Sequence, residues 1–195
     1  MRTPFLGLAL AAVLAAPLAA TPGTASAQTY TIDHDHTSVL FFVNHLGFSN
    51  VQGEFGDVKG TFEFNMAKMA DSKVDVTIAT ASIDTDVPAL DQHLRGADFF
   101  DADKYPEIRF TSTGVTLTGP RTGKLTGDLT MHGVTRSVTL DVTFNKAGNH
   151  PFSKVWTAGF SARGFVNRSD FNIRYGLPVI GDTVDIRIEL EGQAK

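Results

Sequence analysis

Apolar and polar residues alternate along almost the whole chain after residue 28, and this period of two constrains the fold more than any other feature. Successive side chains of a β-strand point to opposite faces, so the pattern predicts strands with one apolar face each. The segments are rich in valine, isoleucine, threonine and phenylalanine, which fit a half-buried pleated surface. Eight strands are predicted, and they contain SVLFFV, GTFEFN, KVDVTIATASIDT, EIRFTSTGVTLT, GKLTGDLTMHG, RSVTLDVTFN, TAGFSARGFVN and DTVDIRIELEG.

The connections between these strands are short and rich in turn residues, such as Gly119-Pro120 and Gly148-Asn149. The stretch VQGEFGD joins the second strand, which bends at its glycines. Closure into a barrel would remove the exposed edges of such a sheet, and an eight-stranded barrel is wide enough to hold one small ligand. Gly127 on an inner face is expected to leave room there. A β-sandwich with a solid core would satisfy the same periodicity, so periodicity alone leaves both folds open.

One stretch breaks the alternation and predicts a short helix between strands. Pro88 stands where a helix can begin, and ALDQHLRGADFF then places Leu90, Leu94 and Phe99-Phe100 toward one side. Pro106 returns the chain to an extended strand.

The first 27 residues have the three regions of a secretory signal peptide. Arg2 precedes an apolar run that is too short to span a membrane, and Ala25-Ser26-Ala27 is an A-x-A cleavage pattern. Cleavage after Ala27 would leave residues 28–195 as one domain, exported to the periplasm or secreted and not an integral membrane protein. The chain has no cysteine and a net charge of −4, so it has no disulfide and no basic footprint for nucleic acid.

Several separate motifs resemble the YceI-like family in order and spacing. They are HLRGADFFDADKYPEIRF, LTGDLTMHGVTRSVTLDV, DHTSVLFFVNHLGFSNVQGEF, NRSDFNI and GDTVDIRIELE. The resemblance implies an all-β fold, an extended eight-stranded antiparallel β-barrel that is lipocalin-like in shape. It also implies an apolar tunnel for a polyisoprenoid lipid, such as an isoprenoid quinone or a polyprenol, and a periplasmic location. Asp91-Gln92 and Gly96 depart from the family pattern at the helix edge that would contact the headgroup.

Alternation and the family's tunnel together predict which side chains bind the ligand. Inward-facing positions of several strands should line the tunnel, His45 should lie near the headgroup, and the paired phenylalanines should plug the barrel. The predicted ligand-binding residues are Val39, Phe41, Val43, His45, Val74, Val76, Ile78, Phe99, Phe100, Phe110, Leu129, Met131, Leu140 and Val142.

Two clusters of charged residues resemble metal or catalytic sites, and neither has a complete ligand set in the sequence. Between residues 91 and 107, one histidine stands among several carboxylates without the spacing of a calcium loop or a zinc site. We interpret this stretch as structural, with Asp98 and Asp101 capping backbone N–H groups and Arg95 paired with a carboxylate. In the segment DHDH, His34 and His36 should lie on the same face of a strand. Two histidines do not complete a zinc site, so we interpret the segment as a solvated strand edge unless a third ligand lies nearby. No metal and no cofactor are therefore predicted.

The predicted function is binding, carriage or storage of the lipid, without enzymatic activity. Two alternatives remain open. One is a barrel enzyme that uses His45, His132 or the 91–107 stretch, or a Ser-His-Asp set with Ser169 or Ser112, although no nucleophile elbow is present. The other is a stress-response partner of a membrane redox complex. A homodimer and transient membrane contact are compatible with the sequence. His45 and His132 could each instead satisfy a buried carbonyl, and Arg168 could pair with Asp170.

Overall fold

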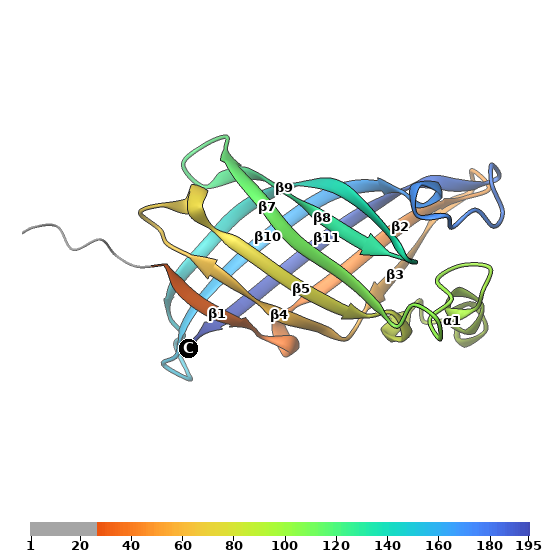
Figure 1. The fold of residues 1–195 in the computed structure, drawn as a ribbon. Helices are drawn as coiled ribbons and strands as arrows, with labels where there is room; N and C mark the ends of the chain where they lie inside the picture. The colour runs from red at the N-terminus through yellow and green to blue at the C-terminus, as the bar shows by residue number, and fades with distance from the viewer. Residues whose placement is uncertain (1–26) are drawn as a thin grey trace, which may run out of the picture.

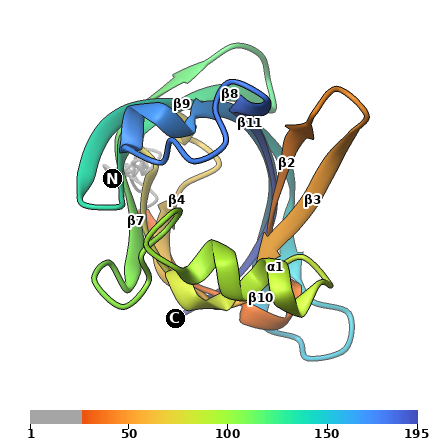
Figure 2. The same cartoon turned by 90° about the vertical axis from the view of Figure 1, so that its right-hand side faces the viewer.

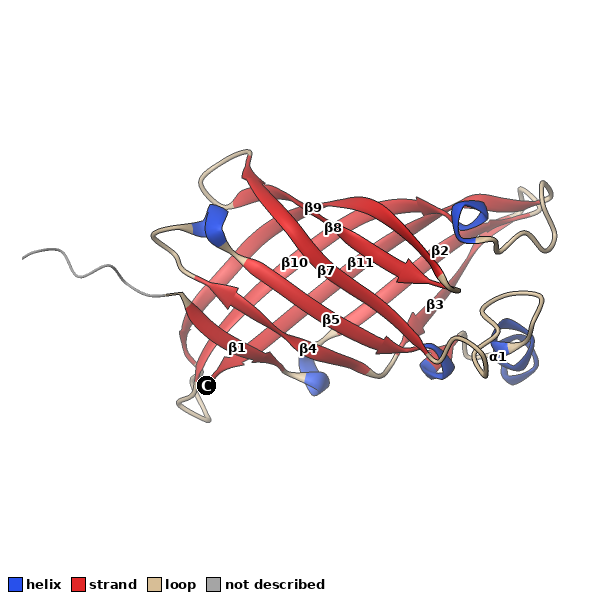
Figure 3. Ribbon diagram, viewed as in Figure 1, coloured by secondary structure: helices blue, strands red, loops and turns tan. Residues whose placement is uncertain are grey.

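The computed structural model describes residues 27–195, and these residues form a closed antiparallel β-barrel that is longer than it is wide (Figure 1). The predicted signal peptide lies outside the described residues except for Ala27. Strands make up most of the described chain (Figure 3). Their bounds are β1 (Gln28–Ile32), β2 (Ser38–His45), β3 (Ser49–Phe55), β4 (Val58–Phe64), β5 (Lys73–Ala79), β6 (Ile83–Asp84), β7 (Glu107–Leu117), β8 (Thr122–Met131), β9 (Val134–Asn149), β10 (Trp156–Asn167) and β11 (Ile180–Ala194).

The eleven strand segments make eight barrel strands because three of the eight are interrupted. β1 and β2 both pair with the same edge of β11. On their other side, β1 pairs with β4 and β2 pairs with β3. β5 then pairs with β4, and β6 pairs with β3, so β5 and β6 form the third interrupted strand. The pairing of β1 with β11 closes the sheet. The predicted eight-stranded barrel is confirmed, and the β-sandwich alternative is wrong.

Three segments differ from the sequence-based expectation. β1 was not among the predicted strands; it is only five residues long and is a strand because both β4 and β11 pair with it. His34–His36 form a 3-10 turn, η1, rather than a strand, so His34 and His36 do not share a strand face. The expected turn at Gly148-Asn149 is also wrong: β9 continues through Asn149 because it still pairs with Trp156 of β10.

The predicted short helix is confirmed as α1 (Pro88–Arg95), with Pro88 in its first turn. It is shorter than expected, because the N–H of Gly96 donates to the His93 carbonyl and ends the helix before Phe99. No helix in residues 27–195 is both long and apolar enough to cross a membrane.

The two ends of the barrel are built differently. α1, the tip of the β2–β3 hairpin and the connection between β10 and β11 gather at one end, which we call the mouth (Figures 1 and 2). The β9–β10 turn and the C-terminus lie at the other, which we call the far end. The buried core follows the inner face of the barrel between them, with Phe62 and Phe64 toward the far end and Ile83, Leu94 and Phe171 toward the mouth.

Candidate ligand-binding tunnel

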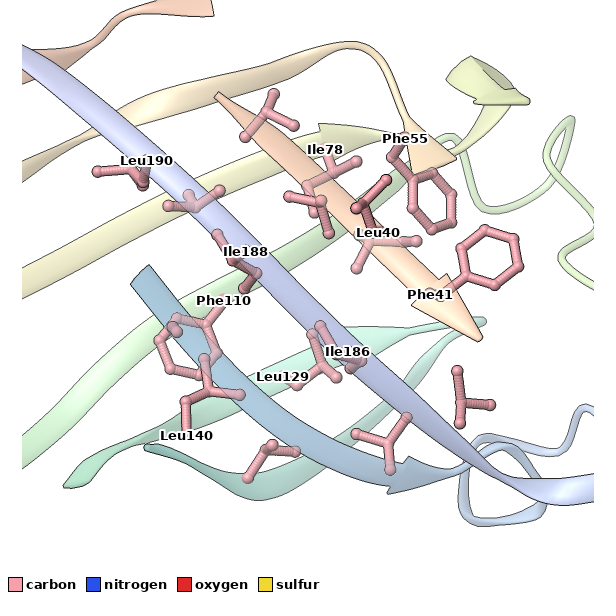
Figure 4. Close-up of a pocket in the computed structure, with 18 of the residues that line it drawn as sticks. Leu40, Phe41, Phe55, Ile78, Phe110, Leu129, Leu140, Ile186, Ile188 and Leu190 are labelled. Atoms are coloured by element: carbon pink, nitrogen blue, oxygen red, sulfur yellow. The ribbon is translucent and has the colours of Figure 1, made fainter. Parts of the chain in front are cut away.

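The interior of the barrel contains a cavity of about 640 Å³. Its walls come from β2, from β4 and β5, from β7 to β11 and from α1, and they are overwhelmingly aliphatic and aromatic. Figure 4 shows side chains of β2, β7 and β11 converging on this space, among them Phe110, Ile186 and Ile188. The geometry suits an elongated apolar molecule.

All fourteen residues predicted from the sequence lie along this cavity. For the twelve of them that lie on strands, alternation assigned the inner face correctly, and their role in ligand binding stays a prediction. The prediction missed further lining residues whose alternation was visible in the sequence, chiefly in β4, β10 and β11: Phe62, Phe64, Phe160, Ala162, Ile186, Ile188 and Leu190.

The expectation that an inner glycine leaves open space is wrong at Gly127. A Cβ atom there would lie 2.4 Å from the ring of Phe110, so the ring of the neighbouring strand already occupies that space. Gly164 is covered in the same way by Leu140, and Gly192 by Phe62. The inner glycines thus let large side chains lie flat against the barrel wall, which keeps those side chains out of the centre.

Aromatic rings fill the far end. Phe160 contacts Phe62, Phe64 and Phe144 with centroid distances of 5.0 to 5.5 Å, and Tyr30 stacks on Phe62 at 4.8 Å. Arg121 covers the outer side of this cluster: its guanidinium lies over the Phe144 ring and donates to the Phe144 carbonyl at 2.9 Å. Four of these rings, those of Phe62, Phe64, Phe144 and Phe160, therefore line the far end of the cavity.

At the mouth, a second aromatic group lies between α1 and the β10–β11 connection. Phe99 is buried, and the His93 ring packs edge-on against both Phe99 and Tyr175 at 5.0 Å. Phe100 contacts Phe55 at 5.6 Å. These contacts agree with the interpretation of the paired phenylalanines as a plug, and they place His93 and Tyr175 as polar groups beside the opening.

Arg168 organises the β10–β11 connection. Its side chain is buried beside the cavity and donates to four backbone carbonyls, those of Ile173, Tyr175, Ile180 and Gly181, at 2.8 to 3.2 Å. The expected pair with Asp170 is therefore wrong. Burial lowers the pKa of the Arg168 guanidinium from its ordinary value, and the charge of Asp182 opposes that shift.

Asp182 supplies the negative charge that opposes the pKa shift of Arg168, and it fixes the start of the same connection. It accepts hydrogen bonds from the backbone N–H of Ser169 at 2.9 Å and from its hydroxyl at 2.7 Å. Burial raises the pKa of this carboxyl, but the bonds from Ser169 and the charges of Arg168 and Arg174 outweigh burial, so the pKa lies below its ordinary value. Asp182 is thus ionised opposite Arg168 at neutral pH.

In the stretch from 91 to 107, the side-chain contacts differ from those expected. Arg95 donates to the carbonyls of Ala81 and Ile83 rather than pairing with a carboxylate. Asp98 bonds to His93 at 3.2 Å instead of capping backbone N–H groups. Buried Asp91 instead accepts hydrogen bonds from the N–H and the hydroxyl of Thr85, which ties α1 to the segment before it. Within residues 27–195, this stretch does not bring three metal-ligating atoms together.

Three of the side chains considered for catalysis, His132, Ser112 and Ser169, have other partners. Nδ1 of His132 lies 3.0 Å from the Phe171 carbonyl oxygen, so this histidine satisfies a backbone carbonyl, which was the alternative to a catalytic role. The Ser112 hydroxyl accepts from the N–H of Val74, and that of Ser169 donates to Asp182. Neither serine is hydrogen-bonded to a histidine in the described part of the chain. His45 lines the cavity at the end of β2, next to the mouth.

Known proteins of similar length and the same fold resemble this chain. A family model, the YceI-like domain, matches residues 30–192. Protein YceI of Shigella flexneri is 41% identical over 197 residues, which cover 98% of both chains. The crystal structure of Burkholderia cenocepacia BcnA is 27% identical, with a TM-score of 0.75 over 82% of this chain and 98% of that one. A polyisoprenoid binding domain from Saccharophagus degradans has a TM-score of 0.63 over 86% and 99% of the two chains; at 15% identity it shows the fold alone.

Proposed function

We infer the function from the premise that this chain belongs to the YceI-like family. We propose that it binds the hydrocarbon tail of a polyisoprenoid lipid inside the barrel and carries or stores that lipid, without catalysing a reaction. The tail belongs to an isoprenoid quinone or a polyprenol. The polyisoprenoid binding domain from Saccharophagus degradans has the same fold, so a barrel of this fold is able to hold such a ligand.

The observation that carries the proposal is the apolar cavity running through the barrel. Burial of hydrocarbon contributes about 0.8 kcal/mol of free energy per methylene-sized group relative to water. An apolar lining therefore stabilises a bound prenyl tail strongly compared with the same tail in water. A free prenyl lipid resides in a membrane rather than in water. The tunnel must therefore compete with lipid. It offers an apolar lining along the barrel and leaves the polar headgroup beside His45, His93 and Tyr175 at the mouth.

Mass spectrometry of an organic extract tests this proposal. Protein purified from its native host without detergent should release a prenyl lipid in an amount close to one molecule per chain. A second exported protein, purified from the same cells in the same way, controls for carry-over of membrane lipid. Equal prenyl lipid in both extracts, or straight-chain fatty acids alone in this protein, would contradict the proposed ligand class.

We further propose that the chain acts in the periplasm after cleavage behind Ala27. The support is the apolar run and the A-x-A pattern of residues 25–27. N-terminal sequencing of the protein from a periplasmic extract should begin at Gln28. Material that begins at Met1 and fractionates with the cytoplasm would show that the export proposal is wrong.

A further inference from the structure

Three metal-ligating side chains meet on the outer face of the barrel, at the seam where the sheet closes. Asp33 precedes the turn η1, His36 ends it, and Glu191 lies on β11. The Nδ1 atom of His36 is 3.0 Å from Oδ2 of Asp33, and one ligand atom from each of the three residues lies within 4.8 Å of the other two. The set joins the two ends of the described chain and is separate from the tunnel.

The interruption between β1 and β2 creates this arrangement. β11 pairs with β2 as far as Glu189 and with β1 from Gly192, so Glu191 lies opposite the turn. The N–H of Asp33 donates to the Glu191 carbonyl at 2.9 Å, which holds the turn against β11. The Asp33 carboxylate also accepts from the N–H of Asp35 at 3.1 Å and from the Gln193 amide at 2.9 Å. Asp33 is thus fixed in place before any ion arrives.

We propose that Asp33, His36 and Glu191 form a binding site for one divalent transition-metal ion of the zinc type. An imidazole and two carboxylates are ordinary zinc ligands, and three protein ligands leave the fourth tetrahedral position for water. Two ligands at zinc-bonding distance in a tetrahedron lie about 3.3 Å apart, close to the 3.0 Å between His36 and Asp33. Rotation of the longer, partly exposed Glu191 side chain closes the third edge.

The charges at the site favour a cation. Two carboxylates with a neutral imidazole carry two negative charges, which a divalent ion balances, and Asp35 of the same turn adds a third. In residues 27–195, the ion-pair partner of Asp33 is His36 and not a lysine or arginine. The sequence alone suggested a metal only if a third ligand joined the DHDH segment, and Glu191 of the last strand meets that condition.

Isothermal titration with zinc chloride alone tests the site, using the whole mature protein stripped with a chelator. We expect one Zn²⁺ per chain. His36→Gln and Glu191→Gln should each weaken binding by at least about tenfold, because each removes one of three ligands. His34→Gln is the matched control: it removes a histidine of the same turn that lies outside the cluster, and binding should not change.

Thermal unfolding supplies a second measurement. Because the site joins the turn before β2 to β11, zinc should raise the melting temperature of the wild type and of His34→Gln, but not of Glu191→Gln. The metal-free variants should all melt like the metal-free wild type, since the mutated side chains are on the surface. Binding that survives Glu191→Gln but is lost equally in both histidine variants would mean local chelation by the DHDH segment and would overturn the proposal. So would the absence of saturable binding in the wild type.

Discussion

Val142→Phe should empty the tunnel while leaving the barrel folded. Val142 faces the cavity from β9, and its neighbours across the strand pairs are small, Gly123 on β8 and Ala162 on β10. A phenylalanine ring can therefore project into the space that the lipid tail would occupy. We expect the co-purified lipid to fall at least about tenfold, which corresponds to about 1.4 kcal/mol of lost binding free energy.

The stability of the lipid-free protein decides what this result means. If the interior is a cavity, the free energy of unfolding of Val142→Phe should change by less than about 1 kcal/mol, whereas overpacking a solid core costs about 1–3 kcal/mol. The comparison requires delipidated protein, because a bound ligand itself raises the apparent stability. Thr143→Phe adds the same ring at the next, outward-facing position and should keep the lipid. A Val142→Phe protein that unfolds, with normal lipid in its folded fraction, would show a packed interior.

Arg168→Met should destabilise the protein by about 2–4 kcal/mol, the range expected when several buried backbone carbonyls lose a charged donor. Methionine keeps much of the apolar volume but cannot bond to the carbonyls of Ile173, Tyr175, Ile180 and Gly181. Arg168→Lys should recover only a minor part of the loss, because one ammonium group cannot reproduce the fork of the guanidinium. Urea unfolding of delipidated protein measures both changes.

Amide hydrogen exchange locates the effect of Arg168→Met. Protection should fall first in residues 172–179, because the four carbonyls that Arg168 binds lie in or beside this connection, and the mouth should loosen before the strands do. Arg163→Met, at an exposed position on β10, the strand that ends just before Arg168, is the control and should stay within about 0.5 kcal/mol of the wild type. An Arg168→Met protein as stable as this control, with residues 172–179 still protected, would contradict the proposed role of Arg168.

The local pattern of the sequence was sufficient for the strand faces and for the helix. Val74, Val76 and Ile78 alternate with polar neighbours, and period two alone places them on the inner face. Pro88 likewise predicts where the helix begins. Proline has no backbone N–H, and an N–H in the first turn of a helix would have no acceptor within the helix. These inferences hold because each depends only on residues a few positions apart.

The tertiary structure decided everything that depends on register between distant segments. The partners of Arg168 are carbonyls, which no sequence pattern distinguishes from those of any other residue. The space beside Gly127 is filled because Phe110 lies on the strand paired with it.

The same limit applies to the seam of the barrel. β1 is a strand only because β4 and β11 flank it, and Glu191 joins Asp33 and His36 only where the closing strands meet. Alternation determines which face a side chain takes, but the partner that it meets across the sheet depends on strand order and closure. The sequence by itself therefore determined an apolar inner surface, and only the closed barrel decided that this surface encloses a cavity and that its outer seam brings three metal-ligating side chains together.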